Sequence, residues 1–437
     1  MSGIRCCDAE LLKKGLTLPG FVERSRTIAS LPSLGLITLA GMTPREHEVS
    51  YFEIQDVAQA ELPSTDYDLV AISSFSAQIG EAYSLADRFR AAGVRVVLGG
   101  LHVTSMPEEA ERHADVVVIG EGETAWPAVL RDAEQGTLKP RYRALDVEFD
   151  LSRAPMPAFH LLDIECYNRL IVQTSRGCPL RCEFCAASIL LTRRYKQKTI
   201  ETVLAEIDRI CELWPRPFLE FADDNAFINR SWWKAFLPEL KKRRVKWFAE
   251  TDMAVHEDLD LLAMMRESGC AQVLIGFESP VPPGLEGLEM RSDWKFKRRS
   301  QYVEAIRRIQ SSGIRVNGCF ILGLDGHTPE IFDAVFEFAE QTELFDVQIT
   351  YQTPFPNTPL YLRLEREGRL LYPQAWERCT LFDLNYRPTP MTESELVQGF
   401  HSLTERLYSA EMSTWRKDRF AKAYRQARSR RGRPSDN

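Results

Sequence analysis

The sequence lacks any long hydrophobic run and any excess of positive charge. No uninterrupted apolar stretch approaches the roughly 18 residues that a membrane-spanning helix needs, and the opening residues MSGIRCCDAELLKK lack the apolar core of a signal peptide. Lys and Arg number 55 against 62 Asp and Glu, for a net charge of −7, whereas general nucleic-acid binders are basic. We therefore expect a cytoplasmic protein with no transmembrane segment and no nucleic-acid partner.

Composition points to an ordered chain with several domains. Hydrophobic residues make up 44% and charged residues 27% of the 437 positions, which is ordinary for globular proteins, and the length predicts two or three domains. In a cytoplasmic protein the ten cysteines are not expected to form a disulfide framework. Each is therefore considered as a core thiol, a metal ligand or a reactive group.

The first 140 residues alternate strand and helix patterns. Strands are expected at 48–54, 68–75, 94–98 and 115–119, and helices at 34–40, 79–92, 107–114 and 124–135. This alternation predicts a doubly wound, Rossmann-like parallel sheet. Ligands of such sheets bind beyond the carboxyl ends of the strands. There the chain has small residues: Ser73, Ser74, Ser76, Gly99, Gly100 and Gly120.

A second α/β series follows a proline-punctuated linker at 141–164. Strands are expected at 170–174, 218–222, 246–249, 272–277, 315–322 and 346–351, with helices between them. Six strand–helix steps are fewer than the eight of a closed barrel. The pattern predicts a partial (β/α)6 barrel over 165–375 and a mostly helical region over 376–437.

Three cysteines with the spacing C-x3-C-x2-C follow the first strand of that series. They are Cys178, Cys182 and Cys185. Thiolates suit iron–sulfur clusters and zinc, but structural zinc sites prefer four ligands and no second cysteine pair is present in the loop. Three unrelated thiols or a zinc loop are the alternatives to a [4Fe–4S] cluster with one iron left open for a substrate or cofactor.

The motif, with Phe184 at its aromatic position, resembles the signature of the radical SAM proteins. The segments FADDNAF at 221–227, ETD at 250–252, LIGFES at 274–279 and GCFILGLD at 318–325 are similar to the motifs that end successive barrel strands in that family. Upstream, LPSLGL at 31–36, VLGGLHVT at 97–104 and GEGE at 120–123 resemble the cobalamin-binding domain of cobalamin-dependent members. The subgroup indicated is the one that contains the hopanoid C-2 methylase.

The resemblance implies cofactors and the residues that bind them. Cys178, Cys182 and Cys185 would hold a [4Fe–4S] cluster whose open iron chelates S-adenosylmethionine, which one electron cleaves to a 5′-deoxyadenosyl radical. For binding S-adenosylmethionine the candidates are Phe184, Asp223, Asp224, Thr251, Gly276, Glu278 and Gly323; for cobalamin they are Ser73, Ser74, Ser76, Gly99, Gly100 and Gly120. Taken singly, each carboxylate could equally be a helix cap or a surface charge.

Two features of the cobalamin-dependent subgroup are missing. The chain has no opening strand of the VLLVNP kind, and it has no D-x-H-x-x-G motif to supply a histidine to cobalt. His102 lies in a turn outside that motif, so we expect it to pack or cap rather than to bind cobalt.

The favoured function is cobalamin-dependent methyl transfer to an unactivated carbon. The substrate would be a small molecule or a lipid, and a flavodoxin or ferredoxin would donate electrons. One alternative is a radical SAM cyclase, coupling enzyme or oxidation enzyme that has lost cobalamin. A more distant alternative is a non-catalytic iron–sulfur sensor.

Overall fold

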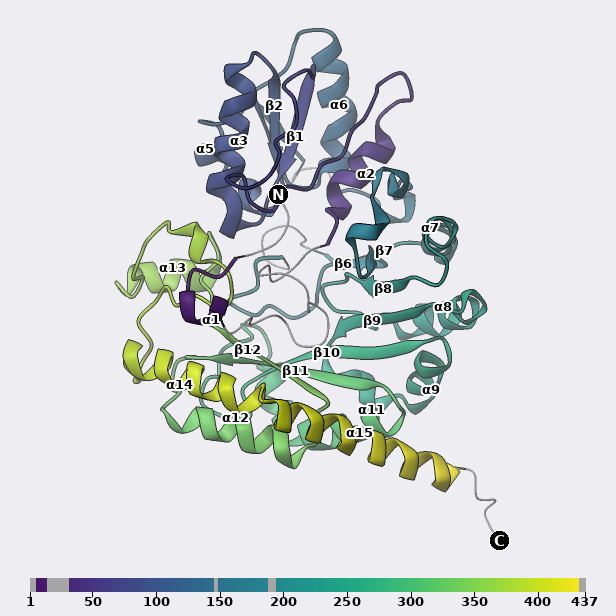
Figure 1. Ribbon diagram of the computed structural model, residues 1–437, viewed down its shortest axis with the longest axis vertical. Helices are drawn as coiled ribbons and strands as arrows, with labels where there is room; N and C mark the ends of the chain where they lie inside the picture. The colour runs from purple at the N-terminus through teal and green to yellow at the C-terminus, as the bar shows by residue number, and fades with distance from the viewer. Residues whose placement is uncertain (1–4, 14–30, 145–147, 188–193, 432–437) are drawn as a thin grey trace.

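Two parallel sheets lie one above the other, and a helical region runs along the far side of the lower sheet (Figure 1). The computed structural model describes residues 5–13, 31–144, 148–187 and 194–431. The predicted fold class is confirmed, with an N-terminal four-stranded sheet, a six-stranded barrel sheet and a mostly helical C-terminal region.

The N-terminal sheet has the order β1-β2-β3-β4. Its strands are β1 (Leu69–Ser73), β2 (Arg95–Gly99), β3 (Val116–Ile119) and β4 (Arg141–Arg143). Successive side chains of a strand point to opposite faces, so Val97 packs with Trp126 on one face while Val96 and Leu98 enter the main core on the other. The helices are α2 (Leu34–Met42), α3 (Ile79–Ala91), α4 (Leu101–Ser105), α5 (Pro107–Ala110) and α6 (Gly122–Glu134).

The strand expected at 48–54 is wrong, because this segment forms no strand. Among the described strands β1 pairs only with β2, and the segment lines the opposite wall of a cavity of about 660 Å³ that borders β1. A strand needs a neighbour to take up its backbone hydrogen bonds, and no strand among the described residues pairs with this segment. At the other edge, β4 extends the sheet beyond residue 140 into the stretch predicted as a linker.

The six expected barrel strands are all present and parallel. Their order is β12-β11-β10-β9-β8-β5. The strands are β5 (Leu170–Val172), β8 (Phe218–Phe221), β9 (Lys246–Thr251), β10 (Cys270–Glu278), β11 (Arg315–Leu322) and β12 (Asp346–Tyr351). The outer helices are α7 (Ile200–Leu213), α8 (Arg230–Arg243), α9 (Leu259–Glu267), α11 (Tyr302–Ser311) and α12 (Glu330–Gln341).

Alternation along the barrel strands divides a core from a lumen. Phe221, Trp247 and Ile275 are buried against the helices, where Trp233 and Phe236 of α8 form an aromatic cluster with the first two. Each such aromatic pair adds about 0.5–1.5 kcal/mol through ring geometry beyond its area burial. The residues between them, such as Glu250 and Gly276, therefore face the inside of the barrel.

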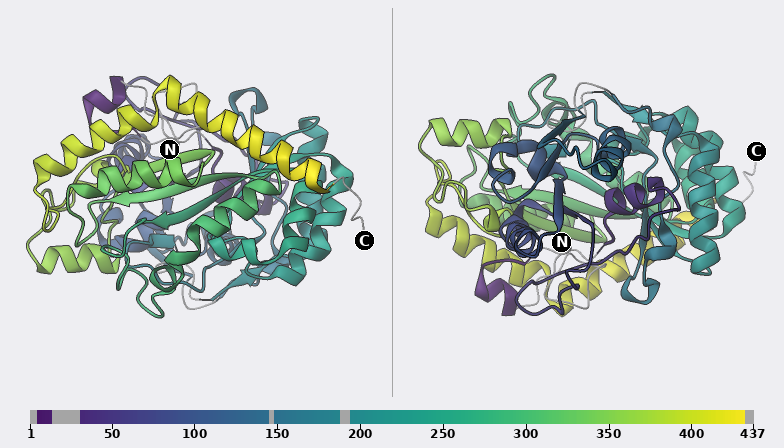
Figure 2. Two further views of the ribbon diagram at one scale, coloured as in Figure 1. Left: turned by 90° about the horizontal axis from the view of Figure 1, so that it is seen from below. Right: turned by 90° about the horizontal axis from the view of Figure 1, so that it is seen from above.

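The C-terminal region packs along the barrel from the carboxyl end of β12, where Phe400 stacks on Tyr351, to the amino end of that strand. It contains α13 (Pro359–Arg366), α14 (Glu393–Leu407) and α15 (Ala410–Arg431). Thr392 and Glu395 form a capping box at the start of α14, and Phe420 of α15 packs on Phe345, next to the start of β12. Figure 2 shows α14 and α15 crossing the underside of the molecule. No helix among the described residues has the length and apolar character to cross a membrane.

Candidate active site

The cysteine loop leaves the carboxyl end of β5 and faces the N-terminal domain. It begins with β6 (Ser175–Arg176), which pairs with β7 (Lys196–Gln197). Cys178 lies near the end of β8, where Asn225 Nδ2 donates to its Sγ over 3.7 Å. Cys182 is buried, which raises the pKa of its thiol to about 12 even though Lys295 opposes the shift. Cys185 N donates to Cys182 O at 3.0 Å, so the three thiols belong to one compact loop.

Two aspartates that end β8 hold the start of this loop. Asp223 Oδ1 accepts from the backbone N–H groups of Thr174 (2.7 Å) and Ser175 (3.0 Å), and Oδ2 accepts from both hydroxyls. Asp224 Oδ2 accepts from Gly177 N at 2.6 Å. The geometry gives Asp223 a positioning role, since the chain's own donors already occupy its carboxylate. That either aspartate binds S-adenosylmethionine stays a prediction.

Glu183, between the second and third cysteines, ties the loop to the barrel from outside. Its backbone N–H donates to Leu288 O (3.0 Å) and its carbonyl accepts from Leu360 N (3.1 Å). Its carboxylate takes both ends of the Arg363 guanidinium, at 2.7 and 3.0 Å, and Arg363 also contacts Asp325 at 2.7 Å. The loop is thus anchored on the segment around Leu288 and on α13, and Arg363 of α13 connects it further to Asp325.

The donor set fits an iron–sulfur cluster better than a single ion. Within residues 5–13, 31–144, 148–187 and 194–431, no three His, Cys, Asp or Glu side chains converge closely enough to hold one metal ion. A cubane cluster binds each cysteine through a different iron atom, so its ligands need to surround a larger object. Three cysteines on one anchored loop suit that requirement.

Glu278 at the end of β10 forms a buried ion pair with Lys295. Its backbone has φ of +64°, which is strained for a residue with a side chain, and the register shifts between Gly276 and Glu278. Lys295 Nζ also donates to Gly276 O at 2.9 Å. A side chain at position 276 would collide with the Glu278 carboxylate. Burial alone would lower the pKa of Lys295, but the Glu278 carboxylate raises it above its ordinary value.

The other three residues predicted to bind S-adenosylmethionine are Phe184, Thr251 and Gly323, and each contacts a different part of the chain. Phe184 packs on Leu285, Leu288, Ile321 and Leu324. Thr251 Oγ1 donates to Ala226 O at 3.0 Å. Gly323 lies against the helical region, because Tyr386 Oη donates to its carbonyl at 2.7 Å and fills the space where a side chain would stand. The binding roles of these three residues also stay predictions.

Sequence analysis did not single out Glu250 or Lys295. The carboxylate of Glu250, on β9, faces the lumen and has no hydrogen-bond or ion-pair partner within the part of the chain that the structure describes. The side chain is exposed to the lumen, but the surrounding barrel withdraws its carboxylate from bulk water and, with the negative charges of Glu220 and Asp224, raises its pKa to about 7. Strand alternation in the ETD segment was the sequence signal that could have placed Glu250 in the lumen. Lys295 lies on a separate short helix, α10 (Trp294–Arg298), and no local sequence pattern links it to the site.

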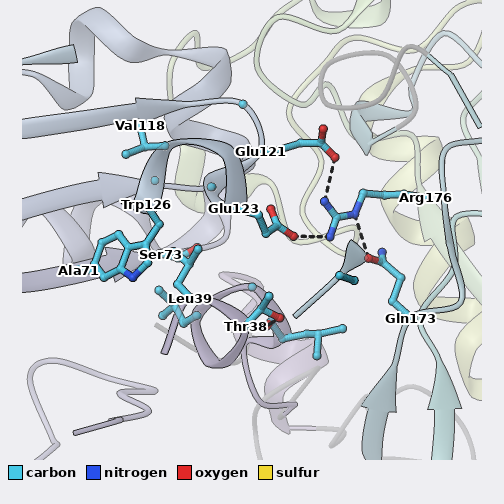
Figure 3. Close-up of a pocket in the computed structure, with 18 of the residues that line it drawn as sticks. Thr38, Leu39, Ala71, Ser73, Val118, Glu121, Glu123, Trp126, Gln173 and Arg176 are labelled. Atoms are coloured by element: carbon cyan, nitrogen blue, oxygen red, sulfur yellow. Dashed lines mark hydrogen bonds and ion pairs between the residues drawn. The ribbon is translucent and has the colours of Figure 1, made fainter. Parts of the chain in front are cut away.

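A second component of the site is a cavity of about 280 Å³ beyond the carboxyl ends of β1, β2 and β3. Its walls include four of the predicted residues, Ser73, Gly99, Gly100 and Gly120, and the apolar side chains of Leu39, Ala71, Val118 and Trp126 (Figure 3). It can take only part of a molecule as large as cobalamin, and its apolar walls suit a flat ring such as benzimidazole. We regard it as fitting the nucleotide tail.

Ser74 and Ser76 lie outside the walls of this cavity. Ser74 Oγ donates to Phe75 O at 2.9 Å, and Ser76 Oγ lies 3.0 Å from Nδ1 of His102. Nε2 of the buried His102 lies 3.4 Å from a Glu109 oxygen, and Glu109 also accepts from Trp376 Nε1 at 3.0 Å. His102 therefore packs at the contact between the N-terminal and C-terminal regions, the role that its position in the sequence favours.

The two components meet at Arg176. Its guanidinium contacts Glu121 at 2.9 Å and Glu123 at 2.6 Å, both at the start of α6, and Gln173 at 2.9 Å (Figure 3). Arg176 and Asp224 line the cavity and stand next to the cysteine loop. The cavity therefore lies directly beside the start of the cysteine loop.

Comparisons with known proteins agree with this geometry. Residues 29–130 match the B12 binding domain, residues 172–339 the radical SAM superfamily, and residues 358–436 a domain of unknown function, DUF4070. An uncharacterized methyltransferase of Synechocystis sp. is 31% identical over 85% of this chain and 70% of its own length. The hopanoid C-2 methylase of Rhodopseudomonas palustris is 29% identical over 79% of this chain and 66% of its own.

The solved structure of the radical S-adenosylmethionine methyltransferase TsrM from Kitasatospora setae, with cobalamin and a [4Fe–4S] cluster bound, has the same fold. Its TM-score is 0.66 at 16% identity, covering 95% of this chain and 98% of that one. Sheet, loop and cavity together define a radical SAM enzyme with a B12-binding domain. The chain belongs to the cobalamin-dependent radical SAM methyltransferases, and its cofactors are a [4Fe–4S] cluster, S-adenosylmethionine and cobalamin. The cobalamin-free alternative and the sensor alternative are set aside.

Proposed function

We propose that this methyltransferase acts on an unactivated carbon of a small-molecule or lipid substrate held between the cysteine loop and the N-terminal cavity. The observation that carries the proposal is that Arg176 and Asp224 line the cavity while Gly177, bonded to Asp224, immediately precedes Cys178. A substrate in this gap would be within reach of both cofactors. The kinship with the hopanoid C-2 methylase favours a lipid over a polar substrate.

Separate sets of residues in the two components bind the separate cofactors. Cys178, Cys182 and Cys185 hold the cluster, and the walls around Ser73 and Gly100 hold the tail of cobalamin. When bound, the cluster and S-adenosylmethionine supply one-electron chemistry that activates a C–H bond, and cobalamin carries the methyl group. The chain itself orients these groups and keeps water out of the gap.

The electron needed for this chemistry comes from outside the chain. We propose a flavodoxin or a ferredoxin as the donor, and the cytoplasm as the compartment. All ten cysteines are free thiols in the structure, as expected where thiols are kept reduced.

The cofactor roles are tested on protein purified and reconstituted without oxygen. We expect the visible absorbance of an iron–sulfur cluster and the conversion of S-adenosylmethionine to 5′-deoxyadenosine and S-adenosylhomocysteine. Cys178→Ala, Cys182→Ala and Cys185→Ala should each lose the absorbance, whereas the control Cys211→Ala, on the outer helix α7, should keep it. A triple variant that keeps the band would refute the cluster assignment.

The substrate class is tested with S-adenosylmethionine that carries a deuterated methyl group. The holoenzyme, a chemical reductant and extracts of the source cells are incubated together, and the lipid and aqueous fractions are analysed by mass spectrometry. We expect the label in the lipid fraction. Label confined to the aqueous fraction would refute the lipid assignment and leave the methyltransferase in place.

A further inference from the structure

The contact between the two cofactor-binding domains is a compact charged cluster around Arg176. The guanidinium binds one carboxylate on each side, Glu121 at 2.9 Å and Glu123 at 2.6 Å. Lys196, on the strand that pairs with β6, places Nζ 2.6 Å from both oxygens of Glu121. Two cations thus face two anions, and the cluster is electrically balanced. We call these four residues the interdomain clamp.

The interdomain clamp is shielded from solvent. Glu121 and Glu123 are each only 9% exposed. Burial opposes ionisation, yet Arg176 keeps the pKa of Glu123 below its ordinary value. Buried ion pairs are poor sources of stability compared with apolar packing, but removing one partner is costly because the other is left uncompensated. The arrangement therefore fixes geometry more than it adds stability.

The position of the interdomain clamp links the two cofactor sites. Glu121, Glu123 and Arg176 line the 280 Å³ cavity, so a molecule in the cavity would touch them. On the other side, Arg176 lies two residues before Cys178, and Asp224 fixes the intervening Gly177 N–H at 2.6 Å. One side chain and one peptide therefore connect the start of α6 to the first cysteine.

We propose that Arg176 is a positioning residue that couples cobalamin binding in the N-terminal cavity to the geometry of the cysteine loop, so that each cofactor binds more tightly when the other is present. This inference rests on the proposed placement of cobalamin in that cavity. Because coupling between two ligands is reciprocal, one affinity ratio describes both directions, and such ratios are typically 5- to 150-fold.

The test compares hydroxocobalamin affinity in cluster-free and cluster-loaded protein, followed by visible absorbance. In the native sequence we expect at least about fivefold tighter binding with the cluster present. Hydroxocobalamin should also shift the electron paramagnetic resonance signal of the reduced cluster. Arg176→Lys keeps the charge but loses the planar fork that contacts both carboxylates, so the ratio should fall towards one and the spectral shift should disappear.

Two further variants support the interpretation. Arg209→Lys is the matched control, because Arg209 makes an exposed ion pair with Glu212 on the outer helix α7, and it should keep the native ratio. Glu123→Gln should lose the coupling as Arg176→Lys does, and it replaces that variant if Arg176→Lys fails to fold.

The outcomes separate the coupling from the placement of cobalamin. A native ratio of one, or a native ratio kept in both Arg176→Lys and Glu123→Gln, would overturn the coupling while leaving the cobalamin site intact. No hydroxocobalamin binding in either state would overturn both.

Discussion

Gly100, where the carboxyl end of β2 meets the start of α4, offers a quantitative test of the cobalamin-binding cavity. Its backbone has φ of 102° and ψ of −174°, a region that is essentially restricted to glycine and costs other residues about 1–3 kcal/mol. A Cβ at this position would lie 2.7 Å from Ser73 Oγ. Crowding of that kind adds about 1–3 kcal/mol. Gly100→Ala should therefore lower the free energy of unfolding by about 2–6 kcal/mol.

Gly93→Ala separates the two contributions. Gly93 also has a positive φ, of 86°, but a Cβ there meets nothing within 4 Å. We expect this control to show backbone strain alone, about 1–2 kcal/mol. The difference between the two variants in urea or thermal unfolding of cofactor-free protein then measures the contact with Ser73 together with the additional backbone strain of Gly100.

Hydroxocobalamin titration completes this test. Gly100 and Ser73 line the cavity, and a loss of about 1.4 kcal/mol in binding corresponds to a tenfold weaker affinity. We expect Gly100→Ala to bind at least tenfold more weakly, and Gly93→Ala to bind as the native protein does. If Gly100→Ala matched Gly93→Ala in stability and the native protein in affinity, the reasoning about the cavity wall would be refuted.

Three other substitutions test the barrel end of the site. In the folded protein the pKa of Glu250 is raised to about 7, whereas in the unfolded chain this carboxyl ionises near pH 4.3. The protonated side chain therefore contributes stability that is fully present below about pH 4.3 and is lost as the pH rises through 7. Glu250→Gln should therefore raise the melting temperature of cofactor-free protein more at pH 8 than at pH 5; an equal effect at both would contradict the shift. Asp223→Asn places an amide N–H₂ opposite donors of Thr174 and Ser175, which should cost about 1–3 kcal/mol in denaturant unfolding. Asp224→Asn, with its single bond from Gly177, should cost less, and the reverse order would refute the positioning role of Asp223.

Local patterns predicted most of the fold. The barrel strands at 315–322 and 346–351 have the expected bounds, because buried parallel strands are continuous apolar runs flanked by helices with clear periodicity. The strand at 48–54 failed for the opposite reason. Its alternation is suitable for a strand, but whether a strand forms depends on a neighbour that lies elsewhere in the chain.

The site was less accessible to sequence reasoning, since its decisive contacts join distant residues. The pairing of Arg176 with Glu121 and Glu123 spans more than 50 positions, and nothing local selects these partners among the many charges of the chain. Ser73 and Ser76 lie in the same short segment, yet only Ser73 lines the cavity. Which side of a turn a hydroxyl occupies is decided by tertiary packing.

The anchoring of Glu183 bears on what happens to the cysteine loop when oxygen destroys the cluster. Iron–sulfur clusters with an open iron are destroyed by oxygen, and in many small metalloproteins the fold is lost with the metal. Here Arg363 and the backbones of Leu288 and Leu360 bind the loop through Glu183, and none of these contacts uses a cysteine side chain. Rebuilding a lost cluster from iron and sulfide would leave these contacts of Glu183 unchanged, because they are made by the chain's own groups.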